Sequence, residues 1–351
     1  MSTKKIVAVV AGASGGHLIP GITSALAALN DESAQEVLFF TTCSLLDQSI
    51  LKNYATTFSI SSLPILPLPG KKWWCYPRFF LSMIKSFFIS FRILRSKKPY
   101  QLISMGGLVS IPVCLAARLL GIKIILFELN AIPGKAVTFL APLAHKIWIC
   151  FDDAGTYFKS EKVQIHSYPL RFTEKDRLEQ DEARKYLGLE PQKKTLLIVG
   201  GSQGSQTINT LIETLISKYP QVLSEIQIIH QTGAYKIGTE FAHHWFADFF
   251  QRKDSTAVVF DFTDDLHICY SAADVVIARA GAGTLFELQY FLKKTLIIPL
   301  ENVAQSHQVD NALAMIRQNP ELFFLLRQHH LQKMPSLLYD QLTKMLNLSG
   351  N

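Results

Sequence analysis

The chain has 351 residues, of which 48% are hydrophobic and 18% are charged, so it is long enough for two domains and has the composition of a globular protein. Its 35 Lys and Arg residues outnumber its 28 Asp and Glu residues, which gives a formal net charge of +7. This balance favours an anionic partner, such as a phosphorylated substrate, a membrane surface or a nucleic acid.

The cysteines and the apolar runs exclude several classes of protein. The five cysteines are scattered and lack CxxC spacing, so we expect reduced thiols in a cytosolic protein and no metal site. The first apolar run is too short for a signal peptide. No stretch of about 18 uncharged apolar residues is present, so no segment is expected to span a bilayer.

The first half of the chain predicts alternating strands and helices. The apolar run Ile6–Val10 predicts a buried strand, and Leu18–Ala27 predicts the helix that follows it. Between them lies a glycine-rich turn, Gly12-Ala13-Ser14-Gly15-Gly16-His17. Further strands are predicted at residues 37–40, 102–105, 122–127 and 146–150. Continuous apolar strands separated by helical segments are typical of parallel sheets covered on both faces.

The second half repeats this pattern. A strand at 195–199 is followed by the turn Gly200-Gly201-Ser202-Gln203-Gly204-Ser205 and a helix over 206–217. Further strands are predicted at residues 226–230, 257–260, 275–278 and 295–299. A more polar segment between the halves predicts a domain junction near Ser167-Tyr168-Pro169. We therefore expect two doubly wound α/β domains, with a phosphate-bearing ligand near the cleft between them.

A stretch rich in aromatic and basic side chains runs from Lys71 to Lys98 and includes a helix predicted over Phe80–Arg95. Aromatic rings at headgroup depth and cations on lipid phosphates would suit an anionic membrane interface. A buried amphipathic helix with a solvated basic face explains the pattern equally well. Nucleic acid is a weaker interpretation, because no nucleic-acid motif accompanies the aromatics.

Several residues at predicted strand ends could carry chemistry. His17 adds to the first glycine turn an imidazole suited to proton transfer near neutral pH; a structural histidine is the alternative. Gly106 and Gly107 form another turn at a strand end, where ligands of α/β proteins bind. Glu128 and Asn130 follow the strand 122–127 and could equally cap a helix.

The second half offers a comparable set. Arg279 and the glycines after it could hold a phosphate, and Glu287 could accept hydrogen bonds from ribose hydroxyls. The alternative is a tight strand–helix turn with Glu287 as a charge on the helix dipole. His307 and Gln308 could present polar groups at a helix start or belong to a plain polar face.

Taken together, these segments resemble the MurG-type N-acetylglucosaminyltransferases of bacterial peptidoglycan synthesis, from Ile6 to about Leu313. The motifs that carry the resemblance are Gly12-x-x-Gly15-Gly16-His17-x-x-Pro20, Met105-Gly106-Gly107-x-Val109-Ser110, Glu128-x-Asn130-x-x-Pro133-Gly134-Lys135, Pro169-x-Arg171, Gly200-Gly201-Ser202-Gln203-Gly204, Phe262-x-Asp264-Asp265, Arg279-x-Gly281-Ala282-x-Thr284-x-x-Glu287 and His307-Gln308-x-x-Asn311-Ala312. The resemblance implies the GT-B fold, in which two Rossmann-like domains face a cleft. It would place the acceptor and membrane site in residues 1–166 and the donor site in 167–336. A last helix, at about 337–351, would pack back on the N-terminal domain.

The resemblance also implies an activity: inverting, metal-independent transfer of N-acetylglucosamine from UDP-GlcNAc to lipid I, the undecaprenyl-diphospho-N-acetylmuramoyl-pentapeptide. The product, lipid II, serves peptidoglycan and cell-wall synthesis, and through them cell shape and division. No cofactor is implied. The enzyme would be a peripheral protein at the anionic cytoplasmic face of the bacterial cell membrane, with no nucleic-acid partner.

Carried over onto this sequence, the catalytic candidates are His17 and Glu128, with His17 acting either as the base for the acceptor hydroxyl or on the diphosphate. The residues that the resemblance assigns to UDP-GlcNAc are Ser14, Gly15, Gly16, Asn130, Arg171, Ser202, Gln203, Gly204, Phe262, Thr263, Ala282, Gly283, Thr284, Glu287, His307 and Gln308. Within these, the Gly15-Gly16 turn would also receive the acceptor diphosphate. The residues assigned to the acceptor or the membrane are Gly106, Gly107, Trp73, Trp74, Phe79, Phe80 and Lys85.

The chain departs from the family pattern mainly on the acceptor side. Leu108 stands where a tyrosine is usual, Phe127 where a histidine is usual, Leu129 where a glutamine is usual and Val137 where an asparagine is usual. These departures motivate an alternative function, a UDP-sugar-binding homologue that has lost turnover. A dinucleotide-dependent oxidoreductase is a third interpretation, and it fits poorly because the first turn lacks GxGxxG spacing and a second glycine cluster is present.

Overall fold

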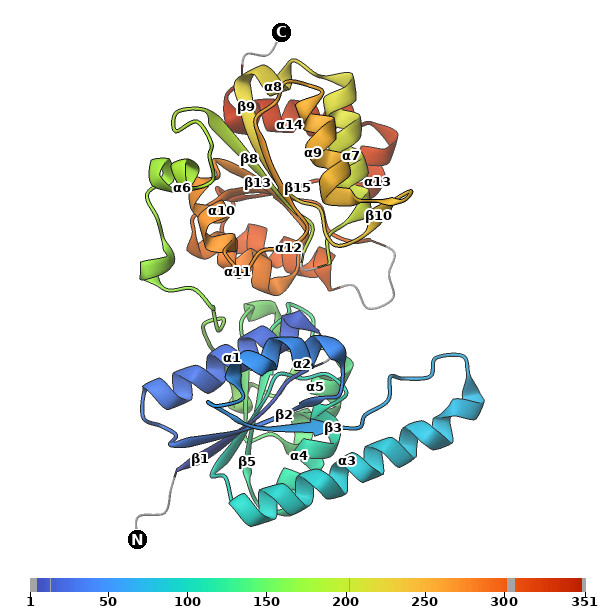
Figure 1. Cartoon of the computed structure of the whole chain (residues 1–351). Coiled ribbons are helices and arrows are strands. Elements are labelled where there is room, and N and C mark those ends of the chain that lie inside the picture. The colour runs from blue at the N-terminus through green and yellow to red at the C-terminus, as the bar shows by residue number, and fades with distance from the viewer. Residues whose placement is uncertain (1–4, 13, 202, 302–306, 349–351) are drawn as a thin grey trace. The chain divides into compact units, whose positions relative to one another are not determined.

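A computed structural model describes residues 5–12, 14–201, 203–301 and 307–348 of the protein. The chain divides into two compact units, Met1–Arg171 and Phe172–Asn351, each with its own parallel sheet (Figure 1). The division falls a few residues beyond the expected junction at 166/167. The predicted α/β class, with two Rossmann-like sheets, is confirmed.

The first unit contains a seven-stranded sheet in the order β3-β2-β1-β4-β5-β6-β7, with every neighbouring pair parallel. Its strands are β1 (Ile6–Val10), β2 (Glu36–Thr42), β3 (Ser59–Leu63), β4 (Gln101–Ser104), β5 (Lys123–Glu128), β6 (Lys146–Ile149) and β7 (Val163–Ile165). The main helices are α1 (Gly15–Asn30), α2 (Leu45–Leu51), α3 (Tyr76–Lys97), α4 (Ser110–Leu119) and α5 (Lys135–Leu140). The predicted strands all fall on observed ones, whereas β3 and β7 were not predicted.

The strands of the first unit are apolar on both faces because helices cover both faces. On one face, Leu94 of α3, Val113 of α4 and Leu140 of α5 join a buried cluster with alternate residues of the strands. On the other face α1 lies so close to the sheet that a Cβ on Gly21 would come within 2.6 Å of the Cβ of Ala11. This close packing brings the start of α1 directly over the end of β1.

The second unit contains a six-stranded parallel sheet in the order β12-β9-β8-β13-β14-β15. Its strands are β8 (Lys194–Val199), β9 (Ile226–Gln231), β12 (Ala257–Phe260), β13 (Val275–Ala278), β14 (Lys294–Ile297) and β15 (Phe323–Leu325), with a small hairpin of β10 (Lys236–Ile237) and β11 (Glu240–Phe241). Its helices are α6 (Gln180–Tyr186), α7 (Gln206–Lys218), α8 (Val222–Glu225), α9 (Ala242–Gln251), α10 (Leu266–Ala272), α11 (Ala282–Tyr290), α12 (Gln308–Gln318), α13 (Gln328–Lys333) and α14 (Ser336–Leu346).

The prediction that the last helix packs on the N-terminal domain is wrong. Leu338, Leu342 and Leu346 of α14 are buried in the core cluster of the second unit. Tyr339 of α14 also stacks on Tyr219, at the end of α7, with ring centroids 4.2 Å apart. The apolar face of α14 therefore completes the core of its own unit.

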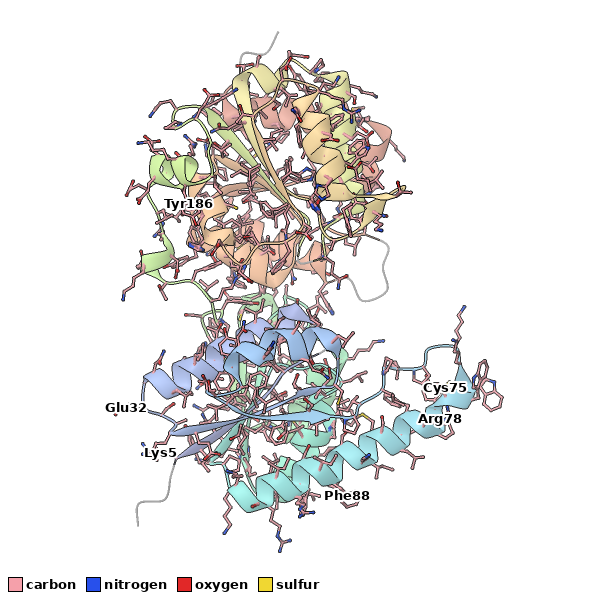
Figure 2. The ribbon with its side chains drawn as sticks, viewed as in Figure 1. Lys5, Glu32, Cys75, Arg78, Phe88 and Tyr186 are labelled. Atoms are coloured by element: carbon pink, nitrogen blue, oxygen red, sulfur yellow. The ribbon has the colours of Figure 1, made fainter. Side chains whose placement is uncertain are left out.

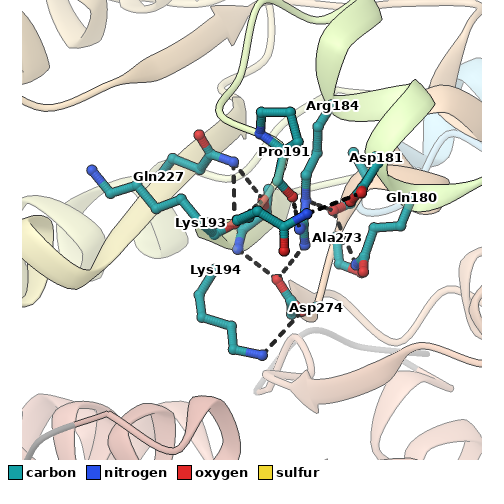
Figure 3. Close-up of polar contacts among 12 residues, drawn as sticks. Gln180, Asp181, Arg184, Pro191, Lys193, Lys194, Gln227, Ala273 and Asp274 are labelled. Atoms are coloured by element: carbon teal, nitrogen blue, oxygen red, sulfur yellow. Dashed lines mark hydrogen bonds and ion pairs between the residues drawn. The ribbon is translucent and has the colours of Figure 1, made fainter.

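A polar network ties the segment after the junction to the second sheet, at the end where the strands begin (Figure 3). Arg184 of α6 is buried and donates to Asp274 Oδ2 at 2.6 Å and to the carbonyls of Ala272 and Pro191. Asp274 Oδ2 also accepts from Thr195 N at 2.7 Å. Since both charges are paired and hydrogen-bonded, this partly buried ion pair can anchor α6 to the sheet.

The topology of each sheet positions the glycine turns. In the first unit the chain order reverses between β1 and β4, and in the second unit it reverses between β8 and β13. The two predicted glycine turns follow β1 and β8, so each lies at a topological switch point, where ligands of open α/β sheets bind. The next turns along the carboxyl edges follow β4 and β13 and contain Gly106-Gly107 and Gly281-Ala282-Gly283.

Candidate functional site

The first glycine turn connects β1 directly to α1. Gly15, Gly16 and His17 form the first turn of the helix, and Ser14 precedes it in an extended conformation. The first N–H groups of any helix have no partner within the helix, and they carry the positive end of its dipole. The Nδ1 atom of His17 lies 3.2 Å from Ser14 Oγ, which orients the imidazole over this turn. Ala13 lies outside the described residues.

The turn after β4 meets the first glycine turn. Gly106 and Gly107 have φ values of +83° and +77°, a backbone conformation that favours glycine. A Cβ on Gly107 would lie 3.7 Å from His17 Nδ1 and 3.9 Å from the carbonyl oxygen of Gly12. The structure therefore brings Gly107 of this turn next to His17, which lies in the first glycine turn with Ser14.

Glu128 lies at the end of β5 and is only 2% exposed. Its carboxylate accepts from Asn130 N at 2.9 Å, from Asn130 Nδ2 at 3.1 Å and from Gly134 N at 2.9 Å. Burial raises the pKa of Glu128, and these hydrogen bonds oppose the rise. The arrangement holds the loop between β5 and α5, so it suits a positioning residue better than a group that exchanges protons with a substrate.

Three departures from the family pattern lie in the core of the first unit. Phe127, Leu129 and Val137 are each at most 3% exposed. A Cβ on Gly106 would lie 2.9 Å from Val137 Cγ2, so this valine packs directly under the Gly106 turn. The side chain of Val137 therefore supports this turn by packing.

The second glycine turn is pressed against the backbone that follows β9. Gly204 has a φ of +73°, and a Cβ there would collide with the carbonyl of Thr232 and with Gly233. Helix α7 begins two residues later, capped by Ser205, whose Oγ accepts from Ile208 N. The start of a helix directly after a glycine turn is the backbone arrangement that suits an anion. Gln203 lies exposed in this turn, whereas Ser202 lies outside the described residues.

Arg279, at the end of β13, braces this turn. It is 7% exposed and donates to Ser205 Oγ through Nε at 3.1 Å and through Nη2 at 2.7 Å. Its Nη1 donates to the carbonyl of Ile298 and to Gln328 Oε1. Burial lowers the pKa of Arg279 to about 10, which leaves it charged at neutral pH. Its guanidinium therefore braces three elements of its own unit, and the hypothesis that it also holds a phosphate stays a prediction.

The turn after β13 leads into α11. Ala282, Gly283 and Thr284 form the first turn of this helix, and Glu287 follows on the next turn, 8% exposed. Tyr270 donates its hydroxyl proton to Glu287 Oε2 at 2.9 Å, which fixes the carboxylate in place. Arg171, which was assigned to the donor phosphates, is the last residue of the first unit.

Two further predicted segments lie at the same carboxyl edge of the second sheet. Phe262 and Thr263 follow β12, and they line a cavity of about 220 Å³ together with Tyr186 and Phe260. His307 precedes α12 as its N-cap, and burial lowers its pKa. Gln308 begins α12, and its Oε1 accepts from Leu300 N at 2.9 Å. This bond fixes the base of the loop between β14 and α12.

A buried polar pair that was not predicted from the sequence lies beneath the second glycine turn. His230 Nε2 lies 2.9 Å from Asn209 Oδ1, and Asn209 Nδ2 donates to the carbonyl of Thr232 at 3.0 Å. Since Thr232 packs on Gly204, this pair supports the turn from below. The available signal was a histidine at the end of an otherwise apolar strand pattern.

Comparison with known proteins identifies the family. Residues 7–149 match the glycosyltransferase family 28 N-terminal domain, and residues 195–349 match the glycosyltransferase family 28 C-terminal domain. A relative from Thermodesulfovibrio yellowstonii is 33% identical over 312 residues, which cover 88% of this chain and 82% of the relative. One from Phocaeicola vulgatus is 31% identical over 313 residues, which cover 89% and 81%. Both are named UDP-N-acetylglucosamine–N-acetylmuramyl-(pentapeptide) pyrophosphoryl-undecaprenol N-acetylglucosamine transferase.

Solved structures show the same fold. The crystal structure of Acinetobacter baumannii MurG matches with a TM-score of 0.72 at 22% identity, covering 97% of this chain and 91% of that one. The UDP-GlcNAc 2-epimerase of Methanocaldococcus jannaschii also matches, with a TM-score of 0.60 at 12% identity over 99% and 94% of the two chains. Since an epimerase and a transferase share this fold, the fold alone does not decide the activity. The two domain matches and the relatives at 31% and 33% identity establish that the chain belongs to glycosyltransferase family 28, among its MurG-type GT-B transferases.

Proposed function

We propose that the chain transfers N-acetylglucosamine from UDP-N-acetylglucosamine to N-acetylmuramyl-(pentapeptide) pyrophosphoryl-undecaprenol, which converts lipid I to lipid II. The observation that carries the proposal is that relatives named for this transfer align with 88% and 89% of the chain, across both sheets. In the reaction the acceptor hydroxyl oxygen bonds to the anomeric carbon of the sugar while the bond from that carbon to UDP breaks. The hydroxyl proton leaves to a base, and the anomeric configuration inverts.

The first unit supplies the acceptor site in this proposal. The N–H groups of Gly15 and Gly16, at the positive end of the α1 dipole, suit the acceptor diphosphate. His17 lies between Ser14 and Gly107 at the same turn. It can accept the hydroxyl proton in its neutral form or donate a hydrogen bond to the diphosphate in its charged form. Glu128 and Asn130 hold the neighbouring loop.

The second unit supplies the donor site. The start of α7 and the Gln203-Gly204 backbone are suited to the donor phosphates, where they would stabilise the negative charge that develops on the departing UDP. Glu287, fixed by Tyr270, suits the ribose hydroxyls. The remaining assigned groups, at the Phe262-Thr263 backbone and at Thr284 and Gln308, lie at the ends of neighbouring elements of the same sheet edge.

The activity is tested by transfer of labelled N-acetylglucosamine from UDP-GlcNAc to a lipid I analogue, with the wild type beside His17→Ala. We expect product from the wild type and a loss of roughly 10²-fold or more in the variant. The pH profile separates the two roles of His17: activity is lost at low pH if it acts as a base and at high pH if it binds diphosphate as a cation. Binding of UDP-GlcNAc without any product would identify a sugar-nucleotide-binding homologue instead, and would reject the proposal.

We also propose that α3 docks the enzyme on an anionic membrane surface. The helix buries Phe79, Ser86, Ser90 and Leu94. Other large apolar side chains remain outside, because Phe80, Ile84 and Phe88 are 58%, 53% and 63% exposed. Phe88 lies on the outer side of the helix in Figure 2. An exposed apolar face of this kind marks an interaction surface.

The segment before α3 extends the apolar surface. Trp73 and Trp74 form a 3₁₀ turn, η2 (Trp73–Cys75), and are 75% and 61% exposed. Phe79, in contrast, is 6% exposed and anchors the start of the helix in the protein. Tryptophan rings are suited to the headgroup region, where their apolar rings and polar N–H groups are both accommodated. No helix in the described part of the chain has the length and hydrophobicity needed to cross a bilayer.

The charge of this region matches an anionic surface. Arg78, Lys85 and Arg92 are exposed and spaced seven residues apart, so they form one row along α3 beside the apolar residues. Residues 48–127 contain eleven Lys and Arg residues and not a single Asp or Glu. Each cation near an anionic leaflet contributes about 1 kcal/mol of attraction, which salt screens.

Vesicle binding tests this surface. We expect Arg78→Gln, Lys85→Gln and Arg92→Gln combined to weaken association with vesicles of anionic phospholipid by about a hundredfold, because three cations at about 1 kcal/mol each are removed. A charge-matched control, Lys175→Gln with Lys185→Gln and Lys253→Gln, removes three exposed cations from the second unit. Equal losses in both variants, or undiminished binding to zwitterionic vesicles, would reject α3 as the docking element.

A further inference from the structure

Asp47 is a carboxylate with 0% exposure in the first turn of α2, shortly after the end of β2. Its Oδ2 accepts from Thr41 Oγ1 at 2.8 Å, from Thr42 N at 3.1 Å and from Thr42 Oγ1. Its own N–H donates to Ser44 Oγ, the N-cap of the helix, at 3.1 Å. A carboxylate is tolerated out of water only when donors satisfy it, so this set of bonds explains the burial and makes the β2–α2 turn rigid.

The backbone of the first glycine turn rests on this carboxylate. A Cβ on Gly12 would lie 2.7 Å from Asp47 Oδ2 and 2.8 Å from Thr41 Oγ1, so only glycine fits. The N–H of Ala11 donates to the carbonyl of Phe40 at 3.1 Å, which keeps β1 paired to β2 up to the turn. The conformation of Gly12 is therefore set by the end of β2 and the start of α2.

Gly12 is also a neighbour of the catalytic candidate. Its carbonyl oxygen lies 3.9 Å from where a Cβ on Gly107 would be, and His17 Nδ1 lies 3.7 Å from the same point. Gly12 thus lies between Asp47 on one side and the Gly107–His17 pair on the other. A shift of Gly12 would therefore disturb its packing against Gly107 and alter the direction in which the chain enters α1.

We propose that Asp47 is a positioning residue for the acceptor site: through Gly12 it holds the first glycine turn, and with it His17, in the geometry that binds the acceptor diphosphate. The inference rests on the proposed function. Asp47 itself touches no substrate. Its buried charge is taken up by the donors of Thr41 and Thr42, so it can lie beside a turn that binds an anion.

Asp47→Asn tests the proposal because it keeps the size of the side chain and removes its charge. We expect kcat/KM for the lipid I analogue to fall about tenfold or more, while KM and Kd for UDP-GlcNAc change less than about twofold. The matched control is Asp274→Asn, which alters a hydrogen-bonded carboxylate in the second unit. That variant is expected to lose stability with little change in kcat/KM for the acceptor.

A second readout does not depend on turnover. The NMR resonances of the His17 ring should shift in Asp47→Asn and stay in place in Asp274→Asn. If Asp47→Asn does not fold, Thr41→Val removes one donor to Asp47 and should give the same shift at smaller size. An unchanged His17 ring, or acceptor kinetics that stay within about twofold of the wild type, would overturn the inference. If the wild type transfers no sugar, but the His17 ring resonances still shift in Asp47→Asn, the proposed function is rejected and the positioning role remains supported.

A double-mutant cycle distinguishes a path through Gly12 from a general loss of stability. Gly12→Ala disturbs the same contact from the other side, because its Cβ would meet Asp47 Oδ2. The effects of Asp47→Asn and Gly12→Ala on acceptor kcat/KM should be non-additive if the two residues act on one contact. Additive effects would reject Gly12 as the route.

Discussion

Buried polar side chains hold the turns at the carboxyl edges of both sheets. Glu128 binds the loop after β5, Arg279 binds Ser205 at the start of α7, and Asp47 supports Gly12. In each case a charged group is satisfied by neighbouring donors or acceptors, which is the condition for burying it. These residues therefore give the glycine turns a fixed shape, and a fixed shape lowers the cost of binding an anion.

A single residue, His230, makes the free energy of unfolding depend on pH. It is fully buried, and burial lowers its pKa from 6.5 to about 3. The unfolded chain binds a proton below about pH 6.5 and the folded protein does not, so stability is full above that pH and is lost as the pH falls toward 3. We expect the free energy of unfolding of the wild type to fall by about 1.4 kcal/mol per pH unit in this window relative to His230→Gln. Denaturant titrations measure this, and equal pH slopes in the two proteins would contradict it.

At the scale of elements, α3 combines two buried serines on its inner face with exposed apolar side chains on its outer face. Ser86 and Ser90 are fully buried, and Ser90 Oγ donates to the carbonyl of Ser86 at 2.8 Å. Small side chains allow α3 to lie close to α4 in the first unit (Figure 1). The apolar side chains on the outer face remain available for a membrane surface, so the packing and the proposed docking depend on the same residue distribution.

Substitution of Ser86 tests this packing. We expect Ser86→Leu to lower the free energy of unfolding by about 1–3 kcal/mol, because the larger side chain overpacks the interface. Ser86→Ala should be neutral or stabilising by up to about 1 kcal/mol, because Ser86 Oγ is buried with no hydrogen-bond partner among the described residues. Denaturant unfolding measures these changes, and Ser96→Leu, at an exposed position of the same helix, is the control. A loss in the control as large as that in Ser86→Leu would refute the interpretation.

At the scale of the whole molecule, the chain builds two separate hydrophobic cores. One cluster lies in the first unit and includes Leu102 of β4, and the other lies in the second unit and includes Leu342 of α14. Each core is completed by helices of its own unit. Each unit can therefore hold its own glycine turns in place.

Leu342→Ala probes the independence of the two cores. Leu342 is 1% exposed, and its truncation should cost about 2–5 kcal/mol. We expect the loss of amide hydrogen-exchange protection to be confined to residues 172–348. Leu102→Ala, which truncates a side chain with 0% exposure in the first unit, should give the converse pattern. Loss of protection across both units in either variant would show that they unfold as one.

Most strands could be predicted from the sequence because they are continuous apolar runs buried on both faces. β3 was missed because it is rich in serine and contains only two apolar residues, Ile60 and Leu63, and β7 and β15 were missed because they are only three residues long. All three are edge strands, where burial is incomplete. Helix α3 begins at Tyr76, four residues before the predicted start, because Pro77 is compatible with a first helical turn.

The amino-acid pattern alone was sufficient to predict the two parallel sheets, the glycine turns at their switch points and the resemblance to the family. These features depend on residues close together in the chain: an apolar run, a glycine cluster and a helix start. Only the tertiary structure revealed that Asp47 supports Gly12, that Arg279 reaches Ser205, and that α14 packs in the second core. These contacts join residues that are separated along the chain. A local sequence pattern does not predict which distant side chain will complete a buried hydrogen bond or fill a core.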